Sequence, residues 1–236
     1  PDVIIHSAAI RDPDACEREP DAAFALHAGA AEAMARWAER RNALLVYIST
    51  DLVFDGLHPP YHEGDVPSPL SVYGASKAAG ESAVSTLSRH LIVRIPLQYG
   101  YFAADDDSFL IKAIRRINAG GIIELDDTQI RYPTLSDDVA SALAALIPSG
   151  VTGIVHLSGP TRMTRYSMFT EIAGVFGCTH AVLAPVSSAG NTFAGGQIAR
   201  RPHDSHLATS RYDSLGLPAV HSFREGLELV RSSLMP

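Results

Sequence analysis

A tyrosine and a lysine stand four residues apart in the heptapeptide SVYGASK, at positions 73 and 77. If this stretch is helical, Tyr73 and Lys77 share one face and reach the same space. A phenol exchanges protons poorly at neutral pH because its ordinary pKa is about 10. A nearby ammonium favours the phenolate, so we expect Lys77 to lower the pKa of Tyr73. Such a pair can give a proton to a carbonyl oxygen during reduction, or take one from an alcohol.

The pair alone is a weak signal, since this spacing is common on exposed helices. Its surroundings strengthen it. The apolar run ALLVYIST at 43–50 is typical of a strand buried on both faces of a parallel sheet, and it ends in two hydroxyl side chains. We expect Ser49 or Thr50, at that strand end, to hold the oxygen of a substrate.

Other apolar runs place this strand in a larger pattern. Strands are predicted at 3–6, 91–96, 121–125 and 153–159, with helices at about 20–40 and from Ser71, as its cap, to about 89. The alternation favours an α/β fold with a doubly wound parallel sheet. Ligands of such sheets bind beyond the carboxyl ends of the strands. That rule points to residues 7–9, residues 49–51 and the segment after Arg94.

The composition excludes several classes of protein. Of 236 residues 46% are apolar, which is enough for a continuous core, and the net charge is −7 with scattered Lys and Arg. We therefore expect no nucleic-acid partner. The sequence has no apolar run of about 18 residues and no leader-like start, so we expect no membrane span and a cytoplasmic protein. Cys16 and Cys178 lack the spacing of metal ligands, and no metal is expected.

Three longer motifs carry a resemblance: YISTDLVFDG, YHEGDVPSPLSVYGASKAAGE and LIVRIPLQYG. Together they resemble the extended short-chain dehydrogenase/reductases, and within them the dTDP-4-dehydrorhamnose reductase branch. DDTQIRYPTLSDDVA and RRPHDSHLATSRY resemble later segments in the same order. The resemblance implies a Rossmann-like dinucleotide-binding part at 1–157 and a substrate lobe at 158–236, to which 97–131 contributes. It also implies reduction of a nucleotide-linked 4-keto sugar or related small carbonyl, with NADP or NAD as cofactor.

The same resemblance assigns roles to individual residues. Thr50, Tyr73 and Lys77 fall on the catalytic triad, in which Tyr73 is the acid, Lys77 also holds the nicotinamide ribose, and Thr50 orients the carbonyl. The residues implied at the cofactor are Ser7, Ala8, Ala9, Ser49, Tyr73, Lys77, Ile95 and Pro96. Those implied at the substrate are Thr50, Asp51, Leu97 and Arg201. Arg201 is included because a guanidinium offers a planar fork of donors to a diphosphate.

Some family features are missing or changed. The 236 residues contain no G-x-G-x-x-G or G-x-x-G-x-x-G motif, so we expect them alone to bind NAD(P)H weakly, without an amide nest for the pyrophosphate. In the family, the first strands and this motif would precede the segment that matches PDVIIHSAA. Either the 236 residues are a fragment of a longer gene product, or the adenine side of the cofactor site has been lost. His27 stands where many relatives have Asn and is interpreted as a structural histidine, as is His6. Leu97 stands where rhamnose-forming reductases tend to have an aromatic residue. The resemblance therefore does not decide which sugar is the substrate.

Two other functions stay open. The branch includes the regulatory subunit of methionine adenosyltransferase, and a non-catalytic binding subunit would not need the cofactor motif. An epimerase or dehydratase would keep the triad and return the hydride to the substrate. The sequence does not fix the assembly, and a homodimer is one option.

Overall fold

A computed structural model describes residues 1–100, 108–187 and 198–234, which fall into two compact units. The first unit consists of the described residues of 1–95, 146–157 and 192–217. The second consists of those of 96–145, 158–191 and 218–236. None of the helices in these described ranges is long and apolar enough to cross a bilayer.

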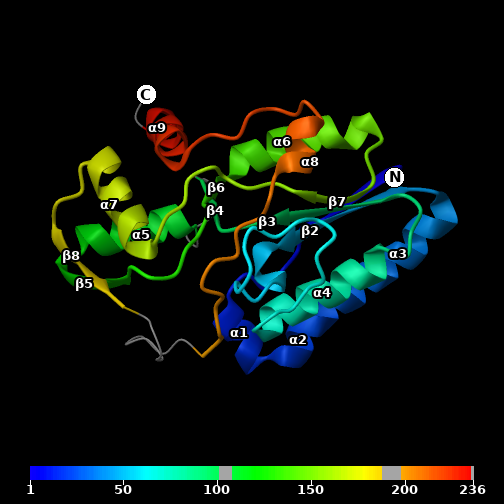
Figure 1. Cartoon of the computed structure of the whole chain (residues 1–236), viewed down its shortest axis with the longest axis horizontal. Helices are drawn as coiled ribbons and strands as arrows, with labels where there is room; N and C mark the ends of the chain where they lie inside the picture. The colour runs from blue at the N-terminus through cyan, green and yellow to red at the C-terminus, as the bar shows by residue number, and fades with distance from the viewer. Residues whose placement is uncertain (101–107, 188–197, 235–236) are drawn as a thin grey trace. The chain divides into compact units, whose positions relative to one another are not determined.

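A four-stranded parallel sheet forms the centre of the first unit, in the order β1-β2-β3-β7 (Figure 1). Its strands are β1 (Val3–His6), β2 (Leu44–Thr50), β3 (His90–Ile95) and β7 (Gly153–His156). The predicted apolar runs become these strands because both faces of the sheet are covered: Leu45 and Val46 have no exposed surface. The predicted α/β fold with a parallel sheet is confirmed.

Two long helices cover one face of this sheet. The helical elements of the first unit are α1 (Pro13–Arg18), α2 (Pro20–Phe24), the π turn η1 (Ala25–Gly29), α3 (Ala30–Arg41), the 3-10 turn η2 (Asp51–Val53), α4 (Val72–Val84) and α8 (Ser210–Ser214). α3 and α4 contact each other and β2 (Figure 1). Ser71 caps α4 as predicted, accepting a 3.2 Å hydrogen bond from the Gly74 amide. The helix predicted over 20–40 is present as α2, η1 and α3 in direct succession, with the π turn in its middle.

The close approach of α4 to β2 and η1 depends on Gly80. A Cβ at this position would lie 2.2 Å from the Tyr47 hydroxyl and 2.5 Å from the His27 carbonyl oxygen. Gly80→Ala is therefore expected to destabilise the protein by roughly 1–3 kcal/mol, although alanine is the better helix former. Gly174→Ala is the matched control, since its Cβ would meet nothing within 4 Å, and we expect a gain of about 0.5–1 kcal/mol there. Urea denaturation of both variants measures the difference, and a stabilised Gly80→Ala protein would contradict this packing.

The second unit is built around its own apolar core. Its elements are β4 (Gln98–Tyr99), α5 (Phe109–Asn118), β5 (Gly121–Asp126), β6 (Thr134–Leu135), most of α6 (Ser136–Ser149), α7 (Arg165–Phe176), β8 (Ala181–Val186) and α9 (Phe223–Leu234). β5 pairs with β8, a strand that the sequence pattern did not predict, and β4 pairs with β6. Tyr99, Leu110, Phe169 and Phe223 lie in the core that joins these elements.

The unit boundaries differ from the predicted division at 158–236. Residues 198–217 belong to the first unit, and their backbone and side chains bond to residues that follow β2. The Tyr61 amide donates to the His206 carbonyl at 2.8 Å, and the Ala208 amide donates to the Tyr61 carbonyl at 2.7 Å. Ser205 donates to the Asp51 carboxylate. The assignment of a dinucleotide-binding part and a substrate lobe stays a prediction.

Candidate active site

Thr50 and Asp51 lie at the carboxyl end of β2, where the predicted site should form. Thr50 pairs in register with Ile95, the last residue of β3, so the two strands end together. The Thr50 hydroxyl donates to one Asp51 oxygen at 3.1 Å and accepts from the Leu52 amide at 3.2 Å. The other oxygen of this buried carboxylate accepts from Ser205. Two hydroxyls therefore hold Asp51 in one orientation.

Tyr73 stands in the first turn of α4, where the Thr50 side chain at this strand end is near enough to affect the pKa of its phenol. Its side chain is half-buried. Burial raises the pKa of Tyr73 to about 12; Thr50 and the charge of Arg11 act against this rise, while Asp51 and Cys16 add to it. The phenol is therefore fully protonated at neutral pH and can act as a proton donor.

Lys77 lies one turn further along α4 and is almost completely buried. Its ammonium donates to the Ile48 carbonyl at 2.5 Å and lies 4.1 Å from the centroid of the Tyr47 ring. Burial lowers the pKa of Lys77 to about 8, and Glu81 partly opposes this by favouring the charged form. Lys77 thus remains mostly protonated at neutral pH.

The predicted effect of Lys77 on Tyr73 is corrected by this geometry. The sequence predicts that the ammonium lowers the pKa of the phenol, but that pKa is raised, and burial is the largest cause. The physical reason is direction: the Lys77 ammonium points to Ile48 and the Tyr47 ring, and burial dominates at Tyr73.

A buried charged cluster lies beside Lys77 and was missed by the sequence reasoning. Glu81 binds Arg94 of β3 through two hydrogen bonds, Nε–Oε1 at 3.0 Å and Nη2–Oε2 at 2.8 Å. The hydroxyl of Ser49 donates to Glu81 at 2.5 Å, so it is directed to this carboxylate. A signal was present in the sequence, because an arginine inside the apolar run LIVRIP needs a buried acidic partner.

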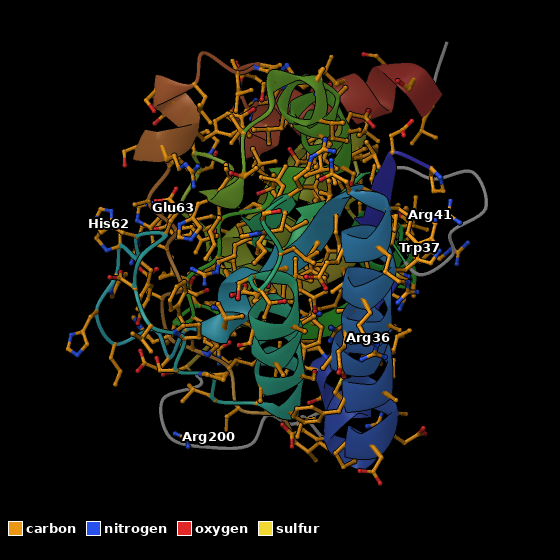
Figure 2. The ribbon with its side chains drawn as sticks, turned by 90° about the vertical axis from the view of Figure 1, so that its right-hand side faces the viewer. Arg36, Trp37, Arg41, His62, Glu63 and Arg200 are labelled. Carbon is orange, nitrogen blue, oxygen red and sulfur yellow. The ribbon has the colours of Figure 1, made fainter. Side chains whose placement is uncertain are left out.

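The cluster continues to His156 and to the loop before α4. Nη1 of Arg94 lies 3.2 Å from Nε2 of His156, whose Nδ1 lies 3.2 Å from the Ala208 carbonyl. Burial first, and then the charge of Arg94, lowers the pKa of His156 to about 3, so its ring is neutral. Glu63, shown beside His62 in Figure 2, accepts from the His156 amide and, through its carbonyl, from Arg94.

The other predicted site residues fall in three places. In the loop after β1, Ser7 and Ala8 are exposed and Ala9 is half-buried. Arg201 belongs to the first unit and binds the Asp14 carboxylate of α1 through two bonds of 3.1 Å. The third place is the second unit, where Pro96 and Leu97 lie; Leu97 packs on its core and accepts from the Thr134 amide at 2.9 Å. Their ligand contacts stay predictions.

The parallel sheet and the polar residues at its carboxyl end define a Rossmann-like α/β protein. Comparison with known families agrees with this class. The chain belongs to the RmlD substrate binding domain family, whose model matches residues 1–235.

Known proteins of two kinds are similar in sequence to this chain. The chain is 37% identical to methionine adenosyltransferase 2 subunit beta of Mus musculus over 245 residues, which are 100% of this chain and 70% of that protein. It is 32% identical to dTDP-4-dehydrorhamnose reductase of Mycobacterium tuberculosis over 234 residues, 96% of this chain and 75% of that one.

A solved structure is similar over almost the full length. It is the dTDP-4-dehydrorhamnose reductase of Bacillus anthracis in complex with NADP, with a TM-score of 0.90 and 31% identity over 99% of this chain and 81% of that one. A dTDP-glucose 4,6-dehydratase of Streptomyces venezuelae with bound NAD has a TM-score of 0.81 at 19% identity, over 97% of this chain and 71% of that one. The second likeness concerns the fold alone.

Proposed function

We propose that this chain forms the catalytic part of an NAD(P)H-dependent reductase of the short-chain dehydrogenase/reductase type. The observation that supports the proposal is that α4, which carries Tyr73 and Lys77, packs against β2, the strand that ends in Thr50. Thr50 is near enough to affect the pKa of the Tyr73 phenol, and the Lys77 ammonium donates to the Ile48 carbonyl of the same strand. The proposed substrate is a nucleotide-linked 4-keto sugar or a related carbonyl, as in the relatives named for that reaction.

Each residue has a distinct proposed task. Tyr73 donates the proton that the carbonyl oxygen needs when a hydride reaches the carbonyl carbon, and Thr50 orients that oxygen. A bound nicotinamide cofactor supplies the hydride. The nicotinamide half is proposed to contact Lys77, whose ammonium is buried, and the exposed residues Ser7 and Ala8 of the loop after β1. Asp51, Leu97 and Arg201 are proposed to contact the sugar nucleotide, and Ala9, Ser49, Ile95 and Pro96 the cofactor.

The proposal is tested by mixing the full-length protein with NADPH and dTDP-4-dehydrorhamnose and following absorbance at 340 nm. We expect oxidation of NADPH that depends on the sugar nucleotide. The rate should fall as the pH rises through about 8, because Lys77 then loses the proton that keeps its ammonium charged. Parallel assays with NADH and with other nucleotide-linked 4-keto sugars define the preference. Absence of turnover with every carbonyl tested, in protein that is folded and binds NADPH, would contradict the reductase.

A second candidate is a subunit of methionine adenosyltransferase. The observation that favours it is the 37% identity to the beta subunit over all of this chain. Under this hypothesis the protein forms a complex with a catalytic methionine adenosyltransferase chain, which size-exclusion chromatography of the mixture detects. Stable co-elution without carbonyl reduction would favour the subunit.

An epimerase or dehydratase would instead convert the nucleotide sugar without net oxidation of NADPH.

Compartment and assembly are also proposals. The cytoplasm remains the predicted location. A homodimer remains the proposed assembly, and light scattering in solution measures it.

A further inference from the structure

His27 lies in the π turn η1 and has no exposed surface. Its Nε2 accepts a 3.0 Å hydrogen bond from the amide of Ile10, in the loop after β1. Because Nε2 is an acceptor in this neutral ring, Nδ1 carries the proton and donates to the Ser76 hydroxyl at 2.8 Å. Ser76 in turn donates to the carbonyl of Tyr73 at 2.9 Å. One hydrogen-bonded chain therefore links the loop after β1 to Tyr73.

The His27 ring also contacts Tyr73 directly. The two ring centroids lie 5.6 Å apart with an angle of 88° between the planes, which is an edge-to-face contact. The backbone carbonyl of His27 accepts a 3.1 Å hydrogen bond from the hydroxyl of Tyr47, whose ring faces the Lys77 ammonium. The same residue thus supports Tyr73 through its ring and the neighbourhood of Lys77 through its backbone.

The charge state of His27 keeps this arrangement constant. Burial, followed by the charge of Lys77 and the nearby His6, lowers the pKa of His27 to about 4. The ring is therefore neutral throughout the physiological range and keeps one donor and one acceptor. A protonated ring would carry two donors and could not accept the Ile10 amide. The π turn is also consistent with a functional position, since such turns are frequent at functional sites.

We propose that His27 is a positioning residue, which holds the loop at residues 7–11 in register with the phenol of Tyr73. The inference rests on the proposed function, in which this loop contacts the nicotinamide half of the cofactor. His27 touches neither substrate nor cofactor in this role; it sets the place of the residues that do. A histidine that only fills space would not need a hydrogen-bond partner at each ring nitrogen. Here Nε2 accepts from the Ile10 amide and Nδ1 donates to the Ser76 hydroxyl.

Three variants separate positioning from simple packing. His27→Phe keeps a ring of similar size and removes both hydrogen bonds. His27→Gln restores one acceptor and one donor at the end of its side chain. Ala35→Gly is the stability control: Ala35 is buried on α3, and the change should cost about 1 kcal/mol without touching the chain of bonds.

The first two measurements, nitrogen NMR and hydrogen exchange, do not depend on enzymatic activity. Nitrogen NMR of the wild-type ring should show a bare Nε2 and a protonated Nδ1 down to about pH 5. Hydrogen exchange of the Ile10 amide should become about tenfold faster in His27→Phe, stay near wild type in His27→Gln, and follow only global stability in Ala35→Gly. A proton on Nε2, or equal Ile10 exchange in His27→Phe and Ala35→Gly, would overturn the inference.

Kinetics then test the consequence for the reaction. We expect His27→Phe to raise the KM for NADPH and to lower kcat, with a combined loss of about 10–100-fold, because a small displacement of reacting groups is costly. His27→Gln should recover much of both. If the wild-type protein reduces no carbonyl, the proposed function fails, while tautomer and Ile10 exchange still decide whether His27 positions this loop. Normal kinetics in His27→Phe would overturn the positioning role.

Discussion

Tyr73→Phe is expected to reduce turnover by about 10²–10⁴-fold while the affinity for NADPH stays nearly unchanged. The phenol is the proposed proton donor to the substrate oxygen, and phenylalanine keeps its ring without its proton. The high pKa of Tyr73, about 12, means that this proton is present at every pH at which the protein is assayed. Steady-state kinetics and a cofactor titration of the same preparation measure the two effects separately.

Lys77→Ala is the informative comparison for this variant. The Lys77 ammonium is proposed to support the acid Tyr73 and to bind the nicotinamide ribose. Both kcat and the affinity for NADPH should therefore fall. Tyr61→Phe is the control, because its hydroxyl bonds to Asp55 at 2.6 Å and has no proposed part in the chemistry. A Tyr73→Phe protein with near-normal kcat would show that the acid is assigned to the wrong residue.

Glu81→Gln is expected to destabilise the protein by about 3–5 kcal/mol, because it leaves the Arg94 guanidinium charged and without its counterion in the core. Both side chains of this pair are almost completely buried, at 2% and 6% exposure for Arg94 and Glu81. The variant also removes the charge that favours protonated Lys77, so the alkaline fall in activity should move to lower pH. Urea denaturation and the pH dependence of kcat measure the two results.

Glu32→Gln provides a matched control for the buried pair. Glu32 binds Arg36 at 2.6 Å on α3, but these side chains are 63% and 58% exposed. Such a surface pair contributes about 0–1 kcal/mol, so its loss should leave both stability and the pH profile almost unchanged. Equal effects of Glu81→Gln and Glu32→Gln would mean that the Arg94 charge finds another partner or reaches water.

The sequence alone determined the elements that are defined by local pattern. Apolar runs predicted β1, β2, β3 and β7 because a strand covered on both faces needs continuous apolar side chains. Ser71 was predicted as the cap that begins α4, since capping depends on residues adjacent in the chain. The four-residue spacing placed Tyr73 and Lys77 on one helix. The family resemblance, which the comparisons confirm, depended on motifs of this local kind.

Only the tertiary structure decided how distant residues meet. Periodicity reports whether a side chain is buried and not against which segment, so β8 beside β5 and residues 198–217 beside the sheet were not predictable. Burial raises the pKa of Tyr73, against the expected shift, and the Lys77 ammonium is directed to Ile48 and Tyr47; such shifts depend on burial and on distances in space. The bonds of His27 to Ile10 and Ser76 join segments far apart in the chain, and no spacing in the sequence encodes them.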